Sequence, residues 1–160
     1  MALVVPDASV MVKWFLQNEP LAKRALTLHR DIQNKRCDCI IPEFAFQEVL
    51  NALTKPKAGF TARRAMSALR QLKELRMGEV RTGPRLWRHA LSCVQAYPGL
   101  RFFDACYVAI AQSKSGVWLT HDTAALKAVG HLSYVKSLAD FYGLTNAGNW
   151  KRKPGREAKR

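Results

Sequence analysis

The chain has 160 residues, of which 48% are hydrophobic, and it carries 26 Lys and Arg against 12 Asp and Glu, a formal net charge of +14. This length and composition fit one globular domain and argue against global disorder, and no apolar run approaches the roughly 20 residues of a transmembrane helix. The excess of Lys and Arg favours a polyanionic partner, because surface cations neutralise phosphates and release counterions.

Strand-like and helical patterns alternate in the first third of the chain. Residues 2–6 form a short apolar run that stops at a Pro-Asp pair, which predicts a buried parallel strand. A helix is expected over residues 9–16, and apolar residues at helical spacing predict a second helix over 21–32. Residues 39–41 are the next predicted strand, and the pattern over 43–54 predicts a helix that ends before Pro and Gly.

The middle of the chain predicts two helices separated by a short strand. Thr61 can cap the first helix, whose inward face is expected to carry Met66, Leu69, Leu72 and Leu75. Residues 79–81 predict a short edge strand. Pro84 suits the first turn of the next helix, whose apolar stripe is expected to consist of Trp87, Ala90, Leu91 and Val94.

The last third predicts a buried helix, a strand, a further helix and a basic tail. Phe103–Ser115 is apolar nearly all round, so we expect a helix deep in the fold, followed by a strand over 117–120 and a helix over 122–129. The final segment KRKPGREAKR is strongly basic and predicts a solvated tail. We therefore divide the chain into one domain, residues 1–145, and a tail, residues 146–160.

Strands separated by helices imply an α/β fold with a parallel sheet flanked by helices on both faces. Ligands in such folds lie beyond the carboxyl ends of the strands. Asp7 directly follows the first predicted strand, and Asp122 follows the strand over 117–120. Both acids are therefore expected at the edge of the sheet where a site forms.

Four acids stand out because each lies among apolar or small residues in a chain that is short of acid: Asp7, Glu48, Asp104 and Asp122. Carboxylates that meet in space bind Mg²⁺ or Mn²⁺, and without a cation such a cluster would be unfavourable. Three acids at helix starts on one sheet edge, together with a Glu inside a helix, would assemble a metal cluster from distant segments. The four residues are therefore the candidate metal-binding and catalytic set.

Each of these acids also has a structural interpretation. Asp7 with its neighbour Ser9 could cap a helix, and Thr120 or Asp122 could cap another. Asp104 lies near a helix N-terminus, where the macrodipole favours negative charge. Glu48 could be a solvent-facing residue of its helix.

The basic composition around an acidic metal cluster points to a phosphodiester substrate and to RNA. Hydrolysis needs an activated water and charge relief at the leaving oxygen, which paired metals roughly 3.5–4 Å apart supply. No Cys or Ser is arranged with a base as a covalent nucleophile requires. His121 could act as a general base, but we favour a water activated by the metal.

Four segments resemble the PIN-domain ribonucleases, and among them the toxins of the VapC type from toxin-antitoxin pairs. They are VVPDASVMVKWFL, IIPEFAFQEVLNAL, FFDACYVAIA and WLTHDTAAL, in the family's order and spacing. The resemblance covers residues 2–142. It departs from the family after Asp122, where no further acid follows in residues 123–126.

The resemblance implies Mg²⁺- or Mn²⁺-dependent cleavage of single-stranded RNA that leaves a 5′-phosphate. Carried over by position, the metal-binding acids are again Asp7, Glu48, Asp104 and Asp122, with Ser9 and Thr120 as polar helpers. It also implies a homodimer and a cognate antitoxin that blocks the site.

Other classes of protein also place an acid after the first strand or bind nucleic acid. A haloacid-dehalogenase-like phosphatase needs an acid two residues after the first Asp, where this chain has Ser9. A response-regulator receiver would need its phospho-acceptor and Lys placed differently. The main alternative is a non-catalytic RNA- or DNA-binding module with a degenerate metal site.

The cysteines and the N-terminus indicate the cellular compartment. The four cysteines form no C-x-x-C pair and have no neighbouring His at zinc-finger spacing, so we expect buried, reduced thiols. The opening MALVVPDAS lacks a basic n-region, so we expect a cytoplasmic protein without an export signal.

Overall fold

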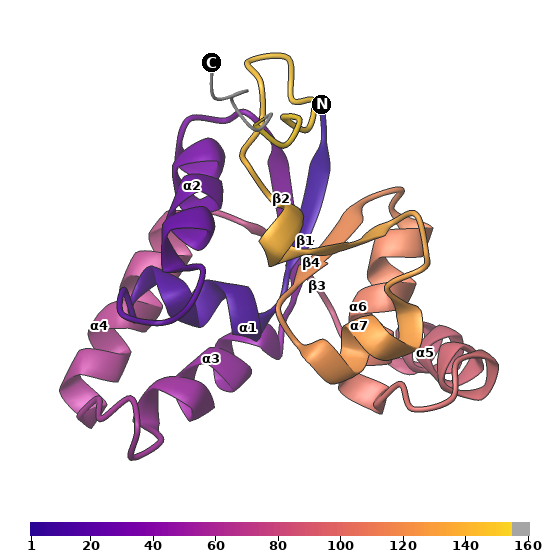
Figure 1. The fold of residues 1–160 in the computed structure, drawn as a ribbon. Coiled ribbons are helices and arrows are strands. Elements are labelled where there is room, and N and C mark those ends of the chain that lie inside the picture. The colour runs from indigo at the N-terminus through magenta and orange to yellow at the C-terminus, as the bar shows by residue number, and fades with distance from the viewer. Residues whose placement is uncertain (155–160) are drawn as a thin grey trace.

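The computed structural model describes residues 1–154 and contains a five-stranded parallel sheet in the order β3-β2-β1-β4-β5 (Figure 1). All four strand pairings are parallel. The strands are β1 (Leu3–Pro6), β2 (Asp38–Pro42), β3 (Gly78–Val80), β4 (Val117–Thr120) and β5 (Val135–Ser137). The predicted α/β class and the parallel sheet are confirmed.

Helices connect successive strands and cover both faces of the sheet, as parallel pairing requires. They are α1 (Ala8–Met11), α2 (Ala22–Gln33), α3 (Ala45–Thr54), α4 (Ala62–Glu74), α5 (Pro84–Ala96), α6 (Phe102–Ser113) and α7 (Thr123–Val129), with 3₁₀ turns at Val12–Trp14 and Leu138–Asp140. Figure 1 shows α1 to α4 gathered on one side of the strands and α5 to α7 on the other.

The strand order places a topological switch point beside β1. The chain builds β2 and β3 on one side of β1 and then crosses to build β4 and β5 on the other side. The helices that follow β1 and β4 therefore diverge, which opens a crevice beyond the carboxyl ends of these two strands. The backbone N–H of Asp7 donates to the carbonyl of Leu119 at 3.2 Å and so joins the two strand ends at this crevice.

The core forms where α6 lies against the sheet, and the middle of this helix is buried as predicted. Residues 105–111 of α6 are all buried, whereas Phe102 and Phe103 at its start are exposed. Residues 112–115 are exposed as well, so the expectation that the whole segment Phe103–Ser115 lies deep in the fold is wrong at both ends. The helix enters the core after its first turn and leaves it before its last residues.

Two predicted apolar stripes are rotated in the structure. Helix α4 buries Ala65, Ala68 and Leu72, so Met66, which was expected inside, is 48% exposed. The buried face of α4 is therefore formed by two small Ala side chains and Leu72, and Met66 lies outside this face. On α5, Trp87 and Leu91 are likewise exposed, because the helix buries Ala90 and Cys93 instead.

The strand β5 and the segment after it were not predicted. Residues 138–151 return along α2, and Leu144 forms an antiparallel bridge with Trp150. Gly143 has a φ of +99°, and a Cβ there would lie 3.0 Å from the Thr27 side chain. A glycine is therefore required at this close approach. The separation of residues 146–160 as a tail stays a prediction, and residues 155–160 lie outside the described part.

A buried carboxylate fixes this C-terminal segment to the domain. Asp31 is 1% exposed, accepts a hydrogen bond from the backbone N–H of Leu144 at 2.9 Å and pairs with Arg36 at 2.9 Å. Its two oxygens therefore satisfy a buried backbone donor and a half-buried cation together.

Two further features agree with the sequence. Cys37, Cys39, Cys93 and Cys106 are buried and free, which confirms the expected buried thiols. Among the described residues, each helix is too short or too polar to cross a membrane.

We predict that Asp31→Ala lowers the free energy of unfolding by about 2 kcal/mol, because the Leu144 N–H loses its acceptor and Arg36 loses its partner. Urea unfolding followed by far-UV circular dichroism measures this loss. Asp38→Ala, at an exposed acid on the neighbouring strand, is the matched control and should be nearly neutral. Equal stability of the two variants would contradict a fixing role for Asp31.

Candidate active site

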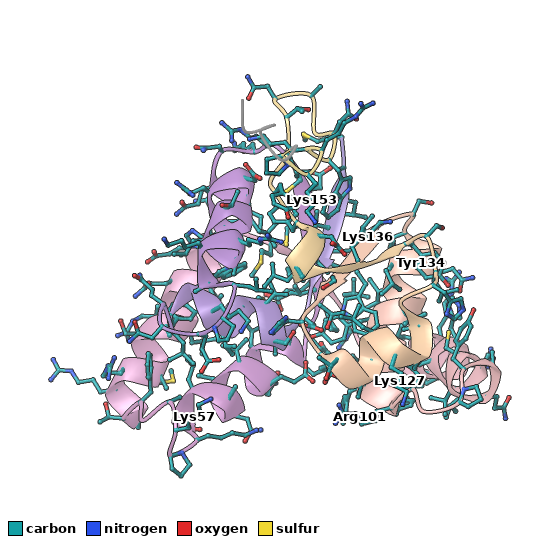
Figure 2. The ribbon with its side chains drawn as sticks, in the orientation of Figure 1. Lys57, Arg101, Lys127, Tyr134, Lys136 and Lys153 are labelled. Atoms are coloured by element: carbon teal, nitrogen blue, oxygen red, sulfur yellow. The ribbon has the colours of Figure 1, made fainter. Side chains whose placement is uncertain are left out.

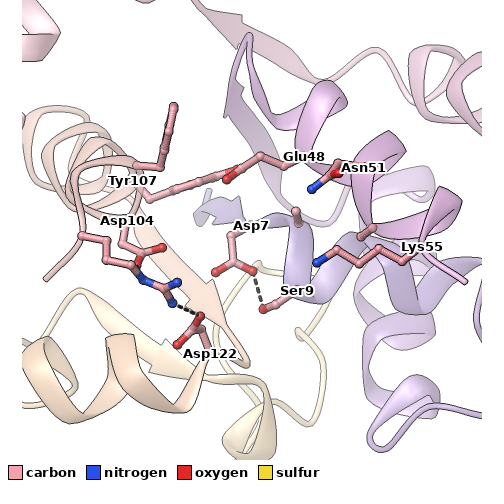
Figure 3. Close-up of a pocket in the computed structure, with 12 residues that line it drawn as sticks. Asp7, Ser9, Glu48, Asn51, Lys55, Asp104, Tyr107 and Asp122 are labelled. Atoms are coloured by element: carbon pink, nitrogen blue, oxygen red, sulfur yellow. Dashed lines mark hydrogen bonds and ion pairs between the residues drawn. The ribbon is translucent and has the colours of Figure 1, made fainter. Parts of the chain in front are cut away.

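The four acids predicted from the sequence line one pocket of about 340 Å³ (Figure 3). Asp7, Glu48, Asp104 and Asp122 come from four separate segments and meet at the carboxyl edge of the sheet, in the crevice between β1 and β4. Ser9 also lines the pocket, whereas Thr120 lies fully buried at the end of β4.

Each of the four acids lies at the start of a helix. Asp7 caps α1 by accepting from the Val10 N–H, and Asp122 caps α7 by accepting from the Ala125 N–H. Their structural roles as caps are therefore real and coexist with their place in the pocket.

The other two acids lie in first turns. Asp104 lies in the first turn of α6, as expected. Glu48 was expected well inside its helix, but α3 begins at Ala45, so Glu48 also lies in a first turn. The strand β2 extends to Pro42, which delays the helix and corrects this prediction.

Asp7 is a buried carboxylate held by three side chains. Ser9 Oγ donates to Oδ1 at 2.5 Å, and the Trp118 indole Nε1 donates to Oδ2 at 3.2 Å. Burial raises the pKa of Asp7 to about 6, against the lowering effect of hydrogen bonds from Ser9 and Thr120. The fold therefore orients this carboxylate but does not fully compensate its charge.

Glu48 reaches the pocket from α3 and is held by Tyr107 of α6. The Tyr107 hydroxyl donates to Glu48 Oε2 at 2.7 Å, and the Tyr107 ring stacks on Trp118 with centroids 5.9 Å apart. Burial raises the pKa of Glu48 to about 7, and the charges of Asp7 and Asp104 add to the shift. Tyr107 and Trp118 therefore orient one acid each while packing against each other.

Arg101 connects the remaining two acids. Its Nη2 donates to Asp122 Oδ2 at 2.8 Å, and its Nε lies 3.4 Å from Asp104 Oδ2. Burial and the charge of Asp122 raise the pKa of Asp104, and Arg101 opposes this rise. The Arg101 side chain is 66% exposed, so the guanidinium enters the pocket from the solvent side.

The two predicted helpers tie the strand ends together. Ser9 Oγ accepts from the His121 N–H at 2.8 Å while donating to Asp7, which links the start of α1 to the loop after β4. Thr120 Oγ1 accepts from the Asp122 N–H at 3.0 Å. The His121 side chain is not among the pocket's lining groups, and burial lowers its pKa.

Several pocket residues were not singled out from the sequence: Asn51, Lys55, Arg101, Phe103 and Tyr107. Helical spacing could have found two of them, because Asn51 follows Glu48 by three residues within α3 and Tyr107 follows Asp104 by three residues within α6. Lys55 and Arg101 are the residues directly after α3 and directly before α6, where helical spacing does not apply. Side chains at these spacings share one helix face, so the two acids mark the faces that form the pocket.

The donor set fits a hard divalent cation, since every acid offers carboxylate oxygens and the pocket is anionic. The guanidinium of Arg101 between Asp104 and Asp122 shows that this part of the pocket accommodates a positive charge. Across residues 1–154, no three His, Cys, Asp or Glu side chains stand close enough together to ligate one ion. The Arg101 guanidinium occupies the space beside Asp104 and Asp122 that a cation held by these two acids would take.

The sheet order and the acid-lined pocket at its carboxyl edge belong to one α/β domain, and the PIN domain model matches residues 4–132 of it. The chain belongs to the PIN domain family, whose members are typically nucleases. The predicted resemblance is confirmed at this level. A sequence comparison with curated proteins gave no match.

Solved structures share this fold at low sequence identity. A toxin-antitoxin complex from Klebsiella pneumoniae aligns with a TM-score of 0.59 at 19% identity, over 90% of this chain and 100% of that chain. VapC20 from Mycobacterium tuberculosis, a sarcin-ricin loop cleaving toxin, gives 0.60 at 14% identity over 79% and 96%. VapBC2 from Rickettsia felis, bound to a promoter DNA fragment, gives 0.61 at 11% identity over 84% and 98%.

We predict that Asp7→Asn stabilises the metal-free protein increasingly as the pH rises. A carboxyl whose folded pKa is raised binds its proton more tightly in the folded state, so folding stability falls as the pH rises from 3.8 towards about 6. The variant should match the wild type at low pH and exceed its free energy of unfolding by at most about 3 kcal/mol above pH 7.

Chemical denaturation in EDTA at pH 4 to 8 measures this difference. The difference between the two proteins is the informative quantity, because His29 and His121, whose pKa values are lowered, contribute a pH dependence of the opposite sign to both. Asp38→Asn, at an exposed acid, should show a constant difference. An Asp7→Asn difference that is constant or shrinks with pH would count against a strained buried carboxylate.

Proposed function

We propose that the protein is a metal-dependent endoribonuclease that hydrolyses phosphodiester bonds of single-stranded RNA, and that it acts as the toxin of a toxin-antitoxin pair. The observation that carries this proposal is the convergence of Asp7, Glu48, Asp104 and Asp122 in one pocket of a chain with a net charge of +14. A strongly basic protein that concentrates acids in one place suits a polyanionic substrate and a cation between them.

Basic side chains stand on both sides of the pocket. Lys55, directly after α3, and Arg101, directly before α6, line it from opposite sides. Figure 2 shows Lys57 on the α3 side and Arg101 on the α6 side of the molecule. An RNA strand that crosses the pocket would therefore meet cations before and after the acids, where its phosphates can be held.

The four acids would hold Mg²⁺ or Mn²⁺, which supplies charge relief and activation of water at the scissile phosphate. Ser9 and Trp118 orient the Asp7 carboxylate, and Tyr107 orients that of Glu48. Thr120 fixes the backbone of Asp122. Such supporting contacts keep the ligands in place when the like charges would otherwise separate them.

In the proposed reaction the oxygen of one water molecule forms a bond to phosphorus, and the bond from phosphorus to the 3′ oxygen breaks. The products are a 5′-phosphate and a 3′-hydroxyl, and one proton of the water passes to the leaving oxygen through solvent. Arg101 and Lys55 stabilise the added negative charge on the phosphoryl oxygens.

The biological part of the proposal rests on the structural neighbours. Two of them are solved as toxin-antitoxin assemblies and a third is a toxin that cleaves the sarcin-ricin loop. By this similarity we propose a homodimer and a cognate antitoxin that blocks the pocket.

A non-catalytic RNA- or DNA-binding module is the second candidate. The ion pairs of Arg101 favour it, because its one positive charge already offsets part of the negative charge of Asp104 and Asp122 without a metal. The two candidates differ in whether a divalent cation can displace the guanidinium.

We predict that Asp104→Asn reduces RNA cleavage more than about 100-fold, beyond the loss typical of residues that only support a ligand. The fold should persist and melt at the same or a higher temperature in EDTA, because the pKa of Asp104 is raised and its charge is therefore unfavourable in the pocket. Cleavage of a fluorescent single-stranded RNA with Mn²⁺ and a thermal melt provide the two readouts.

The matched control for Asp104 is Asp140→Asn, at an exposed acid on the 3₁₀ turn after β5. It should cleave like the wild type. An Asp104→Asn protein that is clearly less stable in EDTA would indicate a structural acid, and one that still cleaves would exclude the proposed site.

We also predict that Arg101→Ala binds Mn²⁺ about two- to five-fold more tightly, because an exposed ion pair no longer competes with the cation. Isothermal titration with Mn²⁺ in the absence of RNA measures this change. Arg70→Ala, at an exposed arginine on α4, should leave the affinity unchanged. If neither wild type nor Arg101→Ala binds Mn²⁺ while both bind RNA, the binding module becomes the better function.

A further inference from the structure

We propose that Phe103 is a substrate-positioning residue that stacks on one unpaired base of the RNA next to the scissile phosphate. This inference rests on the proposed function. Phe103 lies in the first turn of α6, directly before Asp104, and lines the same pocket as the four acids. It is 56% exposed, which is more than any other Phe or Trp among residues 1–154.

The ring of Phe103 is held in place although it faces the solvent. It makes an edge contact with Phe44 at a centroid distance of 5.1 Å and an angle of 69°, and Phe44 in turn packs against Tyr107 at 5.7 Å. Tyr107 is buried and stacks on Trp118 in the core. A chain of aromatic contacts therefore anchors the exposed ring, which reduces the entropy lost when a ligand stacks on it.

The groups around the ring indicate a nucleotide as its ligand. Arg101 and Lys55 line the same pocket and carry the charge that phosphates need, and Asp104 follows Phe103 in the chain. An aromatic face beside backbone-binding cations is the combination by which proteins hold single-stranded nucleic acid. A protein partner on this ring would have to bury charged groups beside it, which is costly without matching charges.

Stacking on Phe103 also defines a class of substrate. A base can cover the ring only when it is unpaired and unstacked from its neighbours, so loops and single strands fit and continuous duplex does not. Because the ring precedes Asp104, the stacked base would belong to a nucleotide adjacent to the cleaved bond. Stacking tolerates every base, so Phe103 would select for single-strandedness and fix the register without a strong base preference.

The test measures RNA binding separately from cleavage. Fluorescence anisotropy in EDTA gives the affinity of the full chain for a short labelled single-stranded RNA, and KM and kcat with Mn²⁺ give the catalytic readout. The variants are Phe103→Ala, Phe103→Leu and Phe103→Tyr. Phe102→Ala is the control for the turn itself, because Phe102 is the adjacent exposed Phe, does not line the pocket and touches the Phe103 ring only edge-on, at a centroid distance of 5.9 Å.

Phe103→Ala and Phe103→Leu should each weaken RNA binding about 5- to 150-fold, the range for losing one base–aromatic stack, while Phe103→Tyr and Phe102→Ala stay near wild type. The loss of cleavage activity in these two variants should appear mainly as a higher KM. A set of RNAs with one abasic nucleotide at each position should contain one member that wild type binds as weakly as Phe103→Ala binds intact RNA. For that RNA, the loss of affinity caused by the abasic nucleotide and the loss caused by Phe103→Ala should not be additive.

Three outcomes would each overturn the stacking role. The first is wild-type RNA affinity of Phe103→Leu, and the second is a set of abasic RNAs in which every member adds its full loss of affinity to that of Phe103→Ala. The third is a sedimentation experiment in which Phe103→Ala differs from wild type in oligomeric state. A change in oligomeric state would mean that a second copy of the chain covers the ring. Binding that depends on Phe103 without any cleavage would instead overturn the proposed nuclease function and leave the stacking role intact.

Discussion

Negative charge is concentrated in one small pocket of a protein that is otherwise strongly basic, and the site is built around this repulsion. Three of the pocket's acids have raised pKa values, and burial is the largest cause in each case. The fold therefore holds carboxylates where their ionised forms are unfavourable. Such strain persists only where surrounding structure over-determines it, which is why it points to function.

The surrounding structure compensates each acid in a different way. Asp7 receives hydrogen bonds from Ser9 and Trp118, Glu48 receives one from Tyr107, and the outer acids share Arg101. The inner acids are thus held by neutral donors that a cation need not displace. The outer acids are held by a solvent-exposed charge that can leave, so the entrance of the pocket is its adjustable part.

Much of the fold could be predicted from the sequence, because buried parallel strands and amphipathic helices have distinct periods. The strand at residues 135–137 could not, since its three residues VKS carry no apolar run and pair only because β4 offers a free edge. The predicted inward face of α4 was wrong at Met66, because hydrophobicity alone ranks Met above Ala, whereas the helix buries Ala65 and Ala68.

The candidate site could likewise be predicted only in part. The four acids could be located because a carboxylate among apolar residues is unusual in a basic chain. Arg101 and Lys55 could not be singled out, since the chain holds 26 Lys and Arg and their number carries no information about which of them face the pocket. Their position depends on where the helices begin, and helix starts are the least certain part of a sequence-based prediction.

The start of helix α6, with the residue before it, carries several side chains of the pocket. Asp104 and Tyr107 are three residues apart and share one helix face, and Arg101 directly precedes the helix, so an acid, a phenol and a cation line the same pocket. Phe103 is rotated by about 100° from Asp104 and therefore lies at the rim, not on the floor. A shift of this helix by a single residue would move all four groups together, so the burial of residues 105–111 fixes the register on which the whole site depends.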